Sequence, residues 1–292
     1  MRVSFSGKLF AMEKLKQELL DVKAKCEKCI PNSELVACVP AQVRVNIVKT
    51  KNKQLTACLQ FPEDYPNKQV LIELKSKSIC DQTLAQLTII CDDAAKKHLG
   101  QPQILLVLRL IGEFLDNNPL CICANEIASI KKLLTDSDEL KLRQATSSLT
   151  LKVVCQKYFL FCKIAIPENY PEEQVGIVEK ECNFPSSFLK WFIAQSVEIA
   201  RQCVQPPLKK DPKAPAFVCK PSLWPVVSFI VETVKRYPCE KCHVCGTVCF
   251  PENPKDVVND ERSGMSIKRI HCGHIYHLRC LLKYMKKPPF QG

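Results

Sequence analysis

Alternating apolar and polar positions along the chain predict a mixed α+β fold in which short strands stand between helices. Residues 11–24 place Leu15, Leu19, Leu20 and Val22 at roughly helical spacing, so an amphipathic helix is expected there. Apolar residues then alternate with polar ones over 43–47, which is the two-residue period of a strand. Two further strands and two closing helices are expected at 54–61, 70–74, 84–99 and 104–115.

The same series of elements recurs in the second half of the chain. Segment 61–66 is matched 105 positions later by segment 166–171, and the match continues without a gap into the following helix. An insertion rich in Pro and Lys, centred on 205–215, adds 14 residues to the second copy, so the later offset is 119. A helix at 126–134 and an alternating strand at 149–153 lead into this copy. The pattern predicts a tandem duplication of a domain of roughly 110 residues, a period too long for a solenoid.

A helix, three or four antiparallel strands, a Tyr-Pro turn and two closing helices resemble the RWD domain, a family related in fold to ubiquitin-conjugating enzymes. Tyr65-Pro66 and Tyr170-Pro171 match the start of the family's Tyr-Pro-x-x-x-Pro turn, whereas Val70 and Val175 stand at its last proline. Proline fixes the backbone of such a turn, and a tyrosine ring can pack beneath it with its hydroxyl on a backbone partner. Both tyrosines are therefore interpreted as structural. The resemblance implies two RWD-like domains, at 9–118 and 121–236.

Cys80 and Cys182 follow the two turns, which raises the question whether either copy is an active conjugating enzyme. The His-Pro-Asn segment of that family, whose asparagine supports the oxyanion, is missing from both copies. No histidine lies between either turn and its cysteine. Because a thiol without a base or an oxyanion donor is normally inert, these cysteines are not expected to be catalytic.

The C-terminal stretch 239–292 contains four of the five histidines and six of the nineteen cysteines. Zn²⁺ binds thiolates and imidazoles together in four-coordinate tetrahedral sites, so this mixture indicates a zinc site. Cys242 and Cys245 are spaced to point both sulfurs at one ion. After a gap of 26 residues the second run of potential ligands is Cys272, His274, His277 and Cys280. Small buried cysteines beside incidental histidines are the less favoured interpretation, because such spacings rarely cluster so tightly.

This order of ligands resembles the RING finger of the RING-H2 type. In that family the first and third ligand pairs share one zinc ion, and the second and fourth pairs share the other. The resemblance implies a complete first site made by Cys242, Cys245, His277 and Cys280, with Zn²⁺ as the cofactor. It implies that Cys272 and His274 are half of the second site.

The fourth ligand pair, a further Cys-x2-Cys, is absent from the sequence, which ends at Gly292. We expect 239–292, called the finger below, to be truncated rather than decayed. A helix expected at 281–285, followed by Pro288-Pro289, is the part of the family's pattern that normally precedes the fourth pair. Whether Cys239 or Cys249 replaces a missing ligand stays open.

Tandem RWD-like domains followed by a RING-like finger resemble RING E3 ubiquitin ligases. The resemblance implies that the finger binds a ubiquitin-charged conjugating enzyme and promotes transfer without a covalent intermediate, while the RWD domains bind a substrate or partner. Val244 and Tyr284 occupy the two apolar positions through which the family contacts the conjugating enzyme. The alternative is a non-catalytic scaffold, in which the paired domains only bind proteins and the finger is structural.

Charge and cysteine usage narrow the choice of partner and compartment. The net charge of +12 suggests binding of phosphates, but Lys and Arg are spread along the whole chain and lack interleaved aromatic residues. A nucleic-acid partner is therefore disfavoured. The longest apolar run, 104–115, contains Arg109 and Glu113 and is too short to cross a bilayer. An odd number of cysteines without a regular framework favours reduced thiols in the cytosol or nucleus, and Cys26-x2-Cys29 is interpreted as structural.

Overall fold

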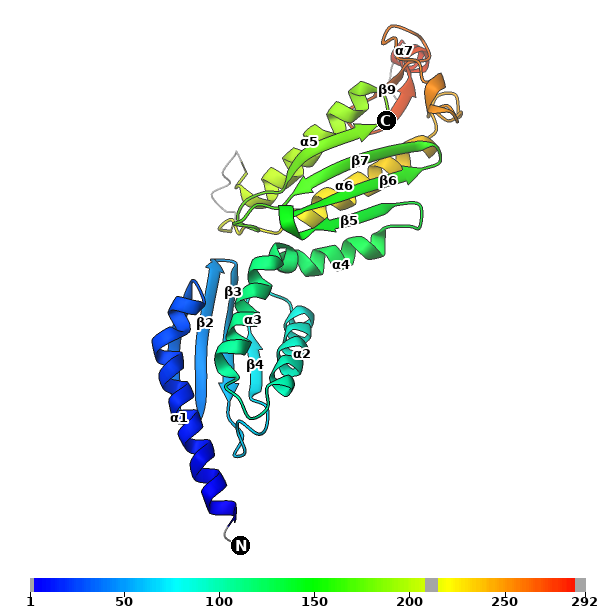
Figure 1. The fold of residues 1–292 in the computed structure, drawn as a ribbon. Helices are drawn as coiled ribbons and strands as arrows, with labels where there is room; N and C mark the ends of the chain where they lie inside the picture. The colour runs from blue at the N-terminus through cyan, green and yellow to red at the C-terminus, as the bar shows by residue number, and fades with distance from the viewer. Residues whose placement is uncertain (1–2, 208–214, 287–292) are drawn as a thin grey trace. The chain divides into compact units, whose positions relative to one another are not determined.

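The structure is a computed structural model that describes residues 3–207 and 215–286. It divides into two compact units (Figure 1). The first unit is Met1–Asn125 with Glu168–Tyr170, and the second is Glu126–Pro167 with Pro171–Gly292. Both are mixed α/β units, as the alternation of helical and strand periods predicts.

The first unit begins with α1 (Val3–Cys29) and continues into one antiparallel sheet. Its four strands lie in chain order and are β1 (Ser33–Val39), β2 (Gln42–Thr50), β3 (Lys53–Gln60) and β4 (Leu71–Lys75). The chain then forms α2 (Asp81–Lys97), α3 (Ile104–Asn117) and the short 3-10 helix η1 (Pro119–Cys123).

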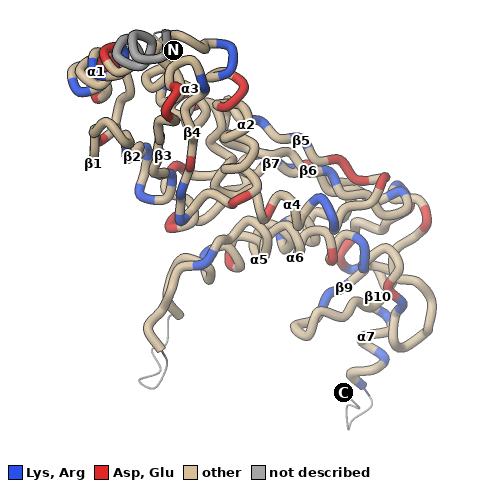
Figure 2. Tube along the Cα trace, turned by 90° about the horizontal axis from the view of Figure 1, so that it is seen from below, with Lys and Arg blue, Asp and Glu red and all other residues tan. Residues whose placement is uncertain are grey.

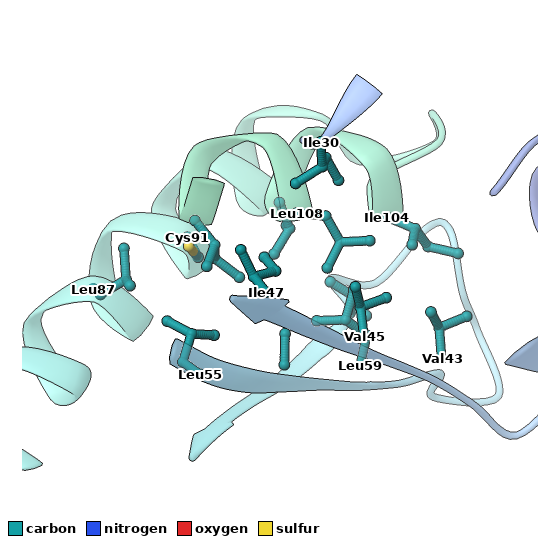
Figure 3. Packing of buried hydrophobic residues seen from close by; sticks show 14 of the residues in the cluster. Ile30, Val43, Val45, Ile47, Leu55, Leu59, Leu87, Cys91, Ile104 and Leu108 are labelled. Carbon is teal, nitrogen blue, oxygen red and sulfur yellow. The ribbon is translucent and has the colours of Figure 1, made fainter. Parts of the chain in front are cut away.

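The core of the first unit is mainly aliphatic (Figure 3). Strand alternation places Val43, Val45 and Ile47 of β2 on one face of the sheet, where all three are fully buried. They pair across the ladder with Leu59, Ala57 and Leu55 of β3. Helices α1, α2 and α3 cover this face with apolar residues at helical spacing, including Val22 of α1. Leu87 and Cys91 of α2 and Leu108 of α3 are labelled in Figure 3.

A buried polar network ties the Tyr-Pro turn to α1 and α3. The Tyr65 hydroxyl donates to a carboxylate oxygen of Glu18 at 2.6 Å, and the Ile104 backbone N–H donates to the other oxygen at 2.8 Å. The Gln103 N–H donates to the Tyr65 oxygen at 3.2 Å, and the Gln103 side chain accepts from the Val70 N–H at 2.9 Å. Burial raises the pKa of the Glu18 carboxyl, although these donors lower it in part. Tyr65 is therefore structural, as the sequence predicts, with a carboxylate as well as a backbone partner.

Two details of the first unit differ from expectation. Helix α1 is longer than the predicted 11–24, and Leu20 is 59% exposed although Leu19 and Val22 are buried. The buried residue beside Leu19 is Glu18. Because Glu18 is acidic, a search for apolar residues at helical spacing does not include it. Strand β1 was not predicted, because a register shift between Leu35 and Ala37 interrupts its apolar alternation.

The second unit has the same order of elements. After α4 (Ala124–Leu133), an antiparallel sheet in chain order is formed by β5 (Glu139–Arg143), β6 (Ser148–Cys155), β7 (Tyr158–Ala165) and β8 (Gly176–Cys182). A 3-10 turn, η2 (Gln144–Thr146), joins β5 to β6. The sheet is followed by α5 (Ser186–Val204), α6 (Leu223–Arg236) and η3 (Tyr237–Cys239).

The element boundaries follow the offsets found in the sequence. The starts of β3 and β7, of β4 and β8, and of α2 and α5 are each 105 positions apart, and α3 and α6 start 119 positions apart. Two hydrogen bonds of the first unit also have counterparts here. The Glu126 carboxylate accepts from the Trp224 N–H at 2.9 Å, as Glu18 does from Ile104. The Ser222 hydroxyl oxygen accepts from the Val175 N–H at 3.1 Å, as the Gln103 side chain does from Val70. Most of the expected insertion at 205–215 lies outside the described residues.

The finger follows η3 within the second unit. Its regular elements are η4 (Pro254–Asp256), the two-stranded antiparallel pair β9 (Ile267–Arg269) and β10 (Ile275–His277), and α7 (Leu278–Met285). Helix α7 includes the helix predicted at 281–285, whereas Pro288-Pro289 lie outside the described residues. In the described part of the chain, no helix combines the length and apolar character needed to cross a membrane.

Candidate metal centre

The first pair of potential ligands lies on a tight turn. An isolated bridge between Lys241 and Val248 closes the base of this turn. Inside it, the Cys242 N–H donates to the Thr247 carbonyl and the Gly246 N–H donates to the Cys242 carbonyl, both at 2.8 Å. Gly246 has a φ of 73°, a left-handed conformation that glycine adopts without strain. The turn brings Cys245 back beside Cys242.

The second pair is carried by the junction of β10 and α7. His277 ends β10 and precedes the first residue of α7, and Cys280 lies in the first turn of that helix. Both side chains are buried. Strand pairing of β10 with β9 fixes His277 opposite Ile267, so the position of the imidazole is set by the hairpin.

The structure brings these two pairs together. The ligand atoms of Cys242, Cys245, His277 and Cys280 all lie within 4.8 Å of one another, and the Cys245 sulfur is 3.5 Å from Nδ1 of His277. A tetrahedral ion with Zn–S of about 2.3 Å and Zn–N of about 2.0 Å separates its ligands by roughly 3.5 to 4 Å. Three thiols and one imidazole therefore fit the donor set and spacing of a structural zinc site, and the cluster could hold a metal ion.

Electrostatics around the four ligands differ from one sulfur to the next. Hydrogen bonds, first of all from the Thr247 hydroxyl 3.1 Å away, lower the pKa of Cys245 to about 6. Burial, followed by the neighbouring thiols of Cys245 and Cys242, raises the pKa of Cys280. Neighbouring thiols are hard to ionise together, because the negative charges of their thiolates repel one another. A bound cation offsets this repulsion and favours the thiolate, which is the form that binds metal.

Cys272 and His274 form a separate pair on the connection between β9 and β10. The Cys272 sulfur lies 3.1 Å from Nδ1 of His274, and the His243 ring stands edge-on to the His274 ring at 4.6 Å between centroids. Among the described residues, no third potential ligand completes a group with Cys272 and His274 at the spacing seen for the first four. His243 was not predicted to matter, and the only sequence signal for it is its place inside the first Cys-x2-Cys.

Cys239 and Cys249 both lie outside the four-residue cluster. Cys239 is exposed and accepts from the Gln156 side-chain amide at 3.5 Å. Cys249 is buried, donates to the Ile275 carbonyl at 3.5 Å, and has its pKa raised to about 12, chiefly by burial. Cys249 is thus a buried thiol that is hydrogen-bonded inside the finger and does not belong to the four-residue cluster.

Val244 and Tyr284 differ in exposure. Val244, between the first two cysteines, is 38% exposed, whereas Tyr284 on α7 is half-buried. Sequence reasoning missed two apolar neighbours of Tyr284 on the same helix, Leu282 and Met285, which are more exposed. The finger therefore displays more apolar surface on α7 than the single aromatic residue that was predicted.

The two cysteines that follow the Tyr-Pro turns lack the surroundings of a nucleophile. The Cys80 sulfur lies 3.1 Å from the Thr83 hydroxyl, a group that is not a base at neutral pH. Burial raises the pKa of Cys182, whose thiol donates to the Phe184 carbonyl at 3.8 Å.

Figure 2 shows Lys and Arg spread over elements of both units rather than gathered on one of them.

Comparison with known proteins identifies part of the chain. Residues 13–115 match the RWD domain family, so the predicted first RWD domain is confirmed. No match to a RING family or to a second RWD domain was found, and no curated protein matches the chain. RWD domains bind ubiquitin-conjugating enzymes and other proteins. The first unit thus indicates a protein-interaction role in the context of ubiquitin conjugation.

Proposed function

We propose that the protein is a RING-type E3 ubiquitin ligase. Its finger recruits a ubiquitin-charged conjugating enzyme, and its RWD-like domains bind a substrate or partner. The observation that carries the proposal is the grouping of Cys242, Cys245, His277 and Cys280 around one point. Two cysteines from the first turn and a His-Cys pair from the junction of β10 and α7 are brought together across 31 intervening residues. A RING-like finger requires this kind of cross-linking between distant ligand pairs.

The metal in this proposal is zinc, and its role is structural. Zinc supplies four bonds that tie the first turn to β10 and α7, in place of the apolar core that such a small unit lacks. Ubiquitin transfer then needs no covalent chemistry from this chain. The finger holds the charged conjugating enzyme so that a substrate lysine meets the thioester in a reactive orientation.

Val244 and Tyr284 are proposed as the contact with the conjugating enzyme. Val244 sits between two metal ligands, so its backbone is held rigid while a large part of its side chain is open to solvent. Exposed apolar groups on a rigid support are typical of protein-binding sites. Leu282 and Met285 extend the apolar surface of α7 and are included in the proposal.

We further propose that residues 121–236 are a second RWD-like domain. The strand order, the constant offset of the element starts and the recurring carboxylate at the start of the last helix support it. A second copy gives the chain two protein-binding modules beside its finger. The absence of a family match for this copy is consistent with its divergent core, described below.

A non-catalytic scaffold is the second candidate. The observation that favours it is the state of Cys272 and His274, which form a pair without further ligands in the described part of the chain. In this alternative one metal ion stabilises the finger and the RWD-like domains perform the only function, which is binding.

The discriminating experiment is discharge of ubiquitin from charged conjugating enzymes by zinc-loaded protein. Val244→Glu should abolish stimulation while leaving zinc content and circular dichroism unchanged. The matched control is Val258→Glu, because Val258 is 39% exposed and lies in the finger away from both ligand pairs in sequence. If a broad panel of conjugating enzymes shows no stimulation by the zinc-loaded wild type, the ligase proposal fails and the scaffold replaces it.

A further inference from the structure

The finger contributes an aromatic side chain to the core of residues 126–236. Phe250, which follows the buried Cys249, is only 3% exposed. Its ring lies 5.2 Å from Tyr158, 5.6 Å from Phe184 and 5.2 Å from Phe188, in each case edge-to-face. Those three residues come from β7, from the connection between β8 and α5, and from α5, so Phe250 fills a site built by the sheet and its covering helix.

The cluster extends from these rings to the connection between the two parts. Phe188 packs edge-on against Tyr237 of η3 at 5.4 Å, and Phe192 stacks on the same ring at 6.0 Å. Aromatic pairs of this geometry contribute beyond the apolar area they bury. Tyr237 belongs to the short segment that leads into the finger, so the same cluster also fixes that segment.

A second contact lies on the hairpin that carries His277. The Arg269 guanidinium of β9 stands 4.0 Å over the ring of Trp191 in α5, which is within the range of a cation–π interaction. Two hydrogen bonds add to it: the Tyr158 hydroxyl donates to the Pro251 carbonyl at 2.8 Å, and Arg236 donates to the Gly273 carbonyl at 2.8 Å. The finger is thus held at separate points along its length.

The first copy of the duplicated sequence supplies an internal control. At the offset of 105, Tyr158, Phe184, Phe188, Trp191 and Phe192 correspond to Lys53, Ile79, Thr83, Gln86 and Leu87. None of the five corresponding residues is aromatic. The aromatic set therefore occurs in the copy that is followed by a finger and is absent from the copy that is not.

We propose that Phe250 and Arg269 are positioning residues, which hold the finger in one orientation on residues 126–236. They neither belong to the ligand cluster nor occupy the proposed conjugating-enzyme contact. The consequence for catalysis rests on the proposed ligase function: a fixed finger directs the charged conjugating enzyme toward a limited set of lysines. Fixing the geometry in advance raises the rate at lysines within that set and lowers it elsewhere.

The docking itself can be tested without any ligase assay. The chain has two tryptophans, so Trp224→Phe leaves Trp191 as the sole reporter, directly beneath Arg269. In the full chain carrying this change, zinc chelation should shift Trp191 emission to longer wavelength, and Arg269→Ala should give part of that shift while zinc stays bound. Trp191 emission that is indifferent to both changes would overturn the docking.

The positioning role is tested by comparing two acceptors. Phe250→Ala should reduce ubiquitin transfer by at least several-fold at those lysines of the chain that the wild type modifies most, while leaving discharge to free lysine unchanged, and Phe250→Leu should restore most of the loss. Arg269→Ala should show the same split more weakly, and it avoids opening a cavity in the core. Equal loss on both acceptors at full zinc content, or no loss on either, refutes positioning. A wild type that stimulates no discharge refutes the proposed ligase function and the positioning role with it, while the fluorescence experiment still decides the docking.

Discussion

The two units share an order of elements but complete their cores in different ways. In the first unit the sheet and three helices enclose aliphatic side chains, and a buried network around Glu18, Tyr65 and Gln103 closes one end. In the second unit one end of the core is aromatic and includes Phe250 from the finger. The core of the first unit is therefore formed within that unit's own domain, whereas the core of the second includes a side chain from the finger, which carries the candidate metal centre. This difference predicts separate responses of the two units to the same perturbation.

The largest effect is expected from loss of the metal. Cys242 is fully buried and is one of the four clustered potential ligands, so with the proposed zinc site Cys242→Ala should abolish zinc binding and unfold the finger. Structural zinc contributes on the order of 10 kcal/mol to such units. Because Phe250 then leaves the aromatic cluster, amide exchange should accelerate in β7 and α5 but not in β2 and β3. Elemental analysis and hydrogen exchange by mass spectrometry measure both parts, and unchanged exchange in β7 would contradict the coupling.

Next in size is the replacement of Phe188 by the residue at the corresponding position of the first copy. Phe188 is buried and touches Phe192, Tyr237 and Phe250, so Phe188→Thr should destabilise the second unit by about 3 to 5 kcal/mol. The matched control is Thr83→Ala in the first unit, where a half-buried hydroxyl is lost and a change within about 0.5 kcal/mol is expected. Denaturant unfolding followed by local hydrogen exchange assigns each change to its unit. Equal effects of the two substitutions would remove the distinction between the cores.

Periodicity was sufficient to predict most of the elements, because apolar alternation in β2 and helical spacing in α3 are regular. The offsets of 105 and 119 rest instead on the repeat of segment 61–66 at 166–171 and on the later insertion, and the element starts of the two units follow them. Periodicity could not predict that the side chains of Glu18 and Phe250 are buried in the cores of the two units. Glu18 is buried by partners 47 and 86 positions away, and Phe250 by rings up to 92 positions away. The four clustered ligands were predicted from spacing and resemblance together, whereas the His243–His274 contact has no short-range signal.

A smaller effect is expected from removing the carboxylates that accept a hydrogen bond at the start of α3 and of α6, which are Glu18 and Glu126. Glu18→Ala leaves the Tyr65 hydroxyl and the Ile104 N–H without their partner inside the core, which should cost the first unit about 1 to 3 kcal/mol. Glu126 accepts from Trp224 but is only half-buried, so water can replace it and Glu126→Ala should cost the second unit less. Thermal unfolding of the two variants measures the difference. A larger loss for Glu126→Ala than for Glu18→Ala would contradict the argument from burial.

The smallest expected effect is an opposite dependence of the two units on pH. Burial raises the pKa of Glu18 above its ordinary 4.5, so ionisation costs the folded first unit stability as pH rises from 4.5 through the folded-state pKa. For Asp138 burial alone would raise the pKa, but hydrogen bonds from Lys235 at 2.6 Å, Thr135 and Val154 outweigh it and hold the pKa below 3.8. Asp138 therefore stabilises the second unit above pH 3.8, and this contribution is lost as pH falls through the folded-state pKa.

Neutral variants isolate each of these contributions from the general effect of acid. Glu18→Gln should remove the loss of stability that the first unit shows above pH 4.5, and it should leave the second unit unchanged. Asp138→Asn should destabilise the second unit at neutral pH and converge on the wild type in acid, because the wild-type carboxyl is then protonated too. Release of the proposed zinc at low pH would affect Asp138→Asn and its parent alike, so the difference between their unfolding curves is the quantity to measure. A difference for Asp138→Asn that is constant down to pH 2 would show that the ion pair with Lys235 is not the source of the stability.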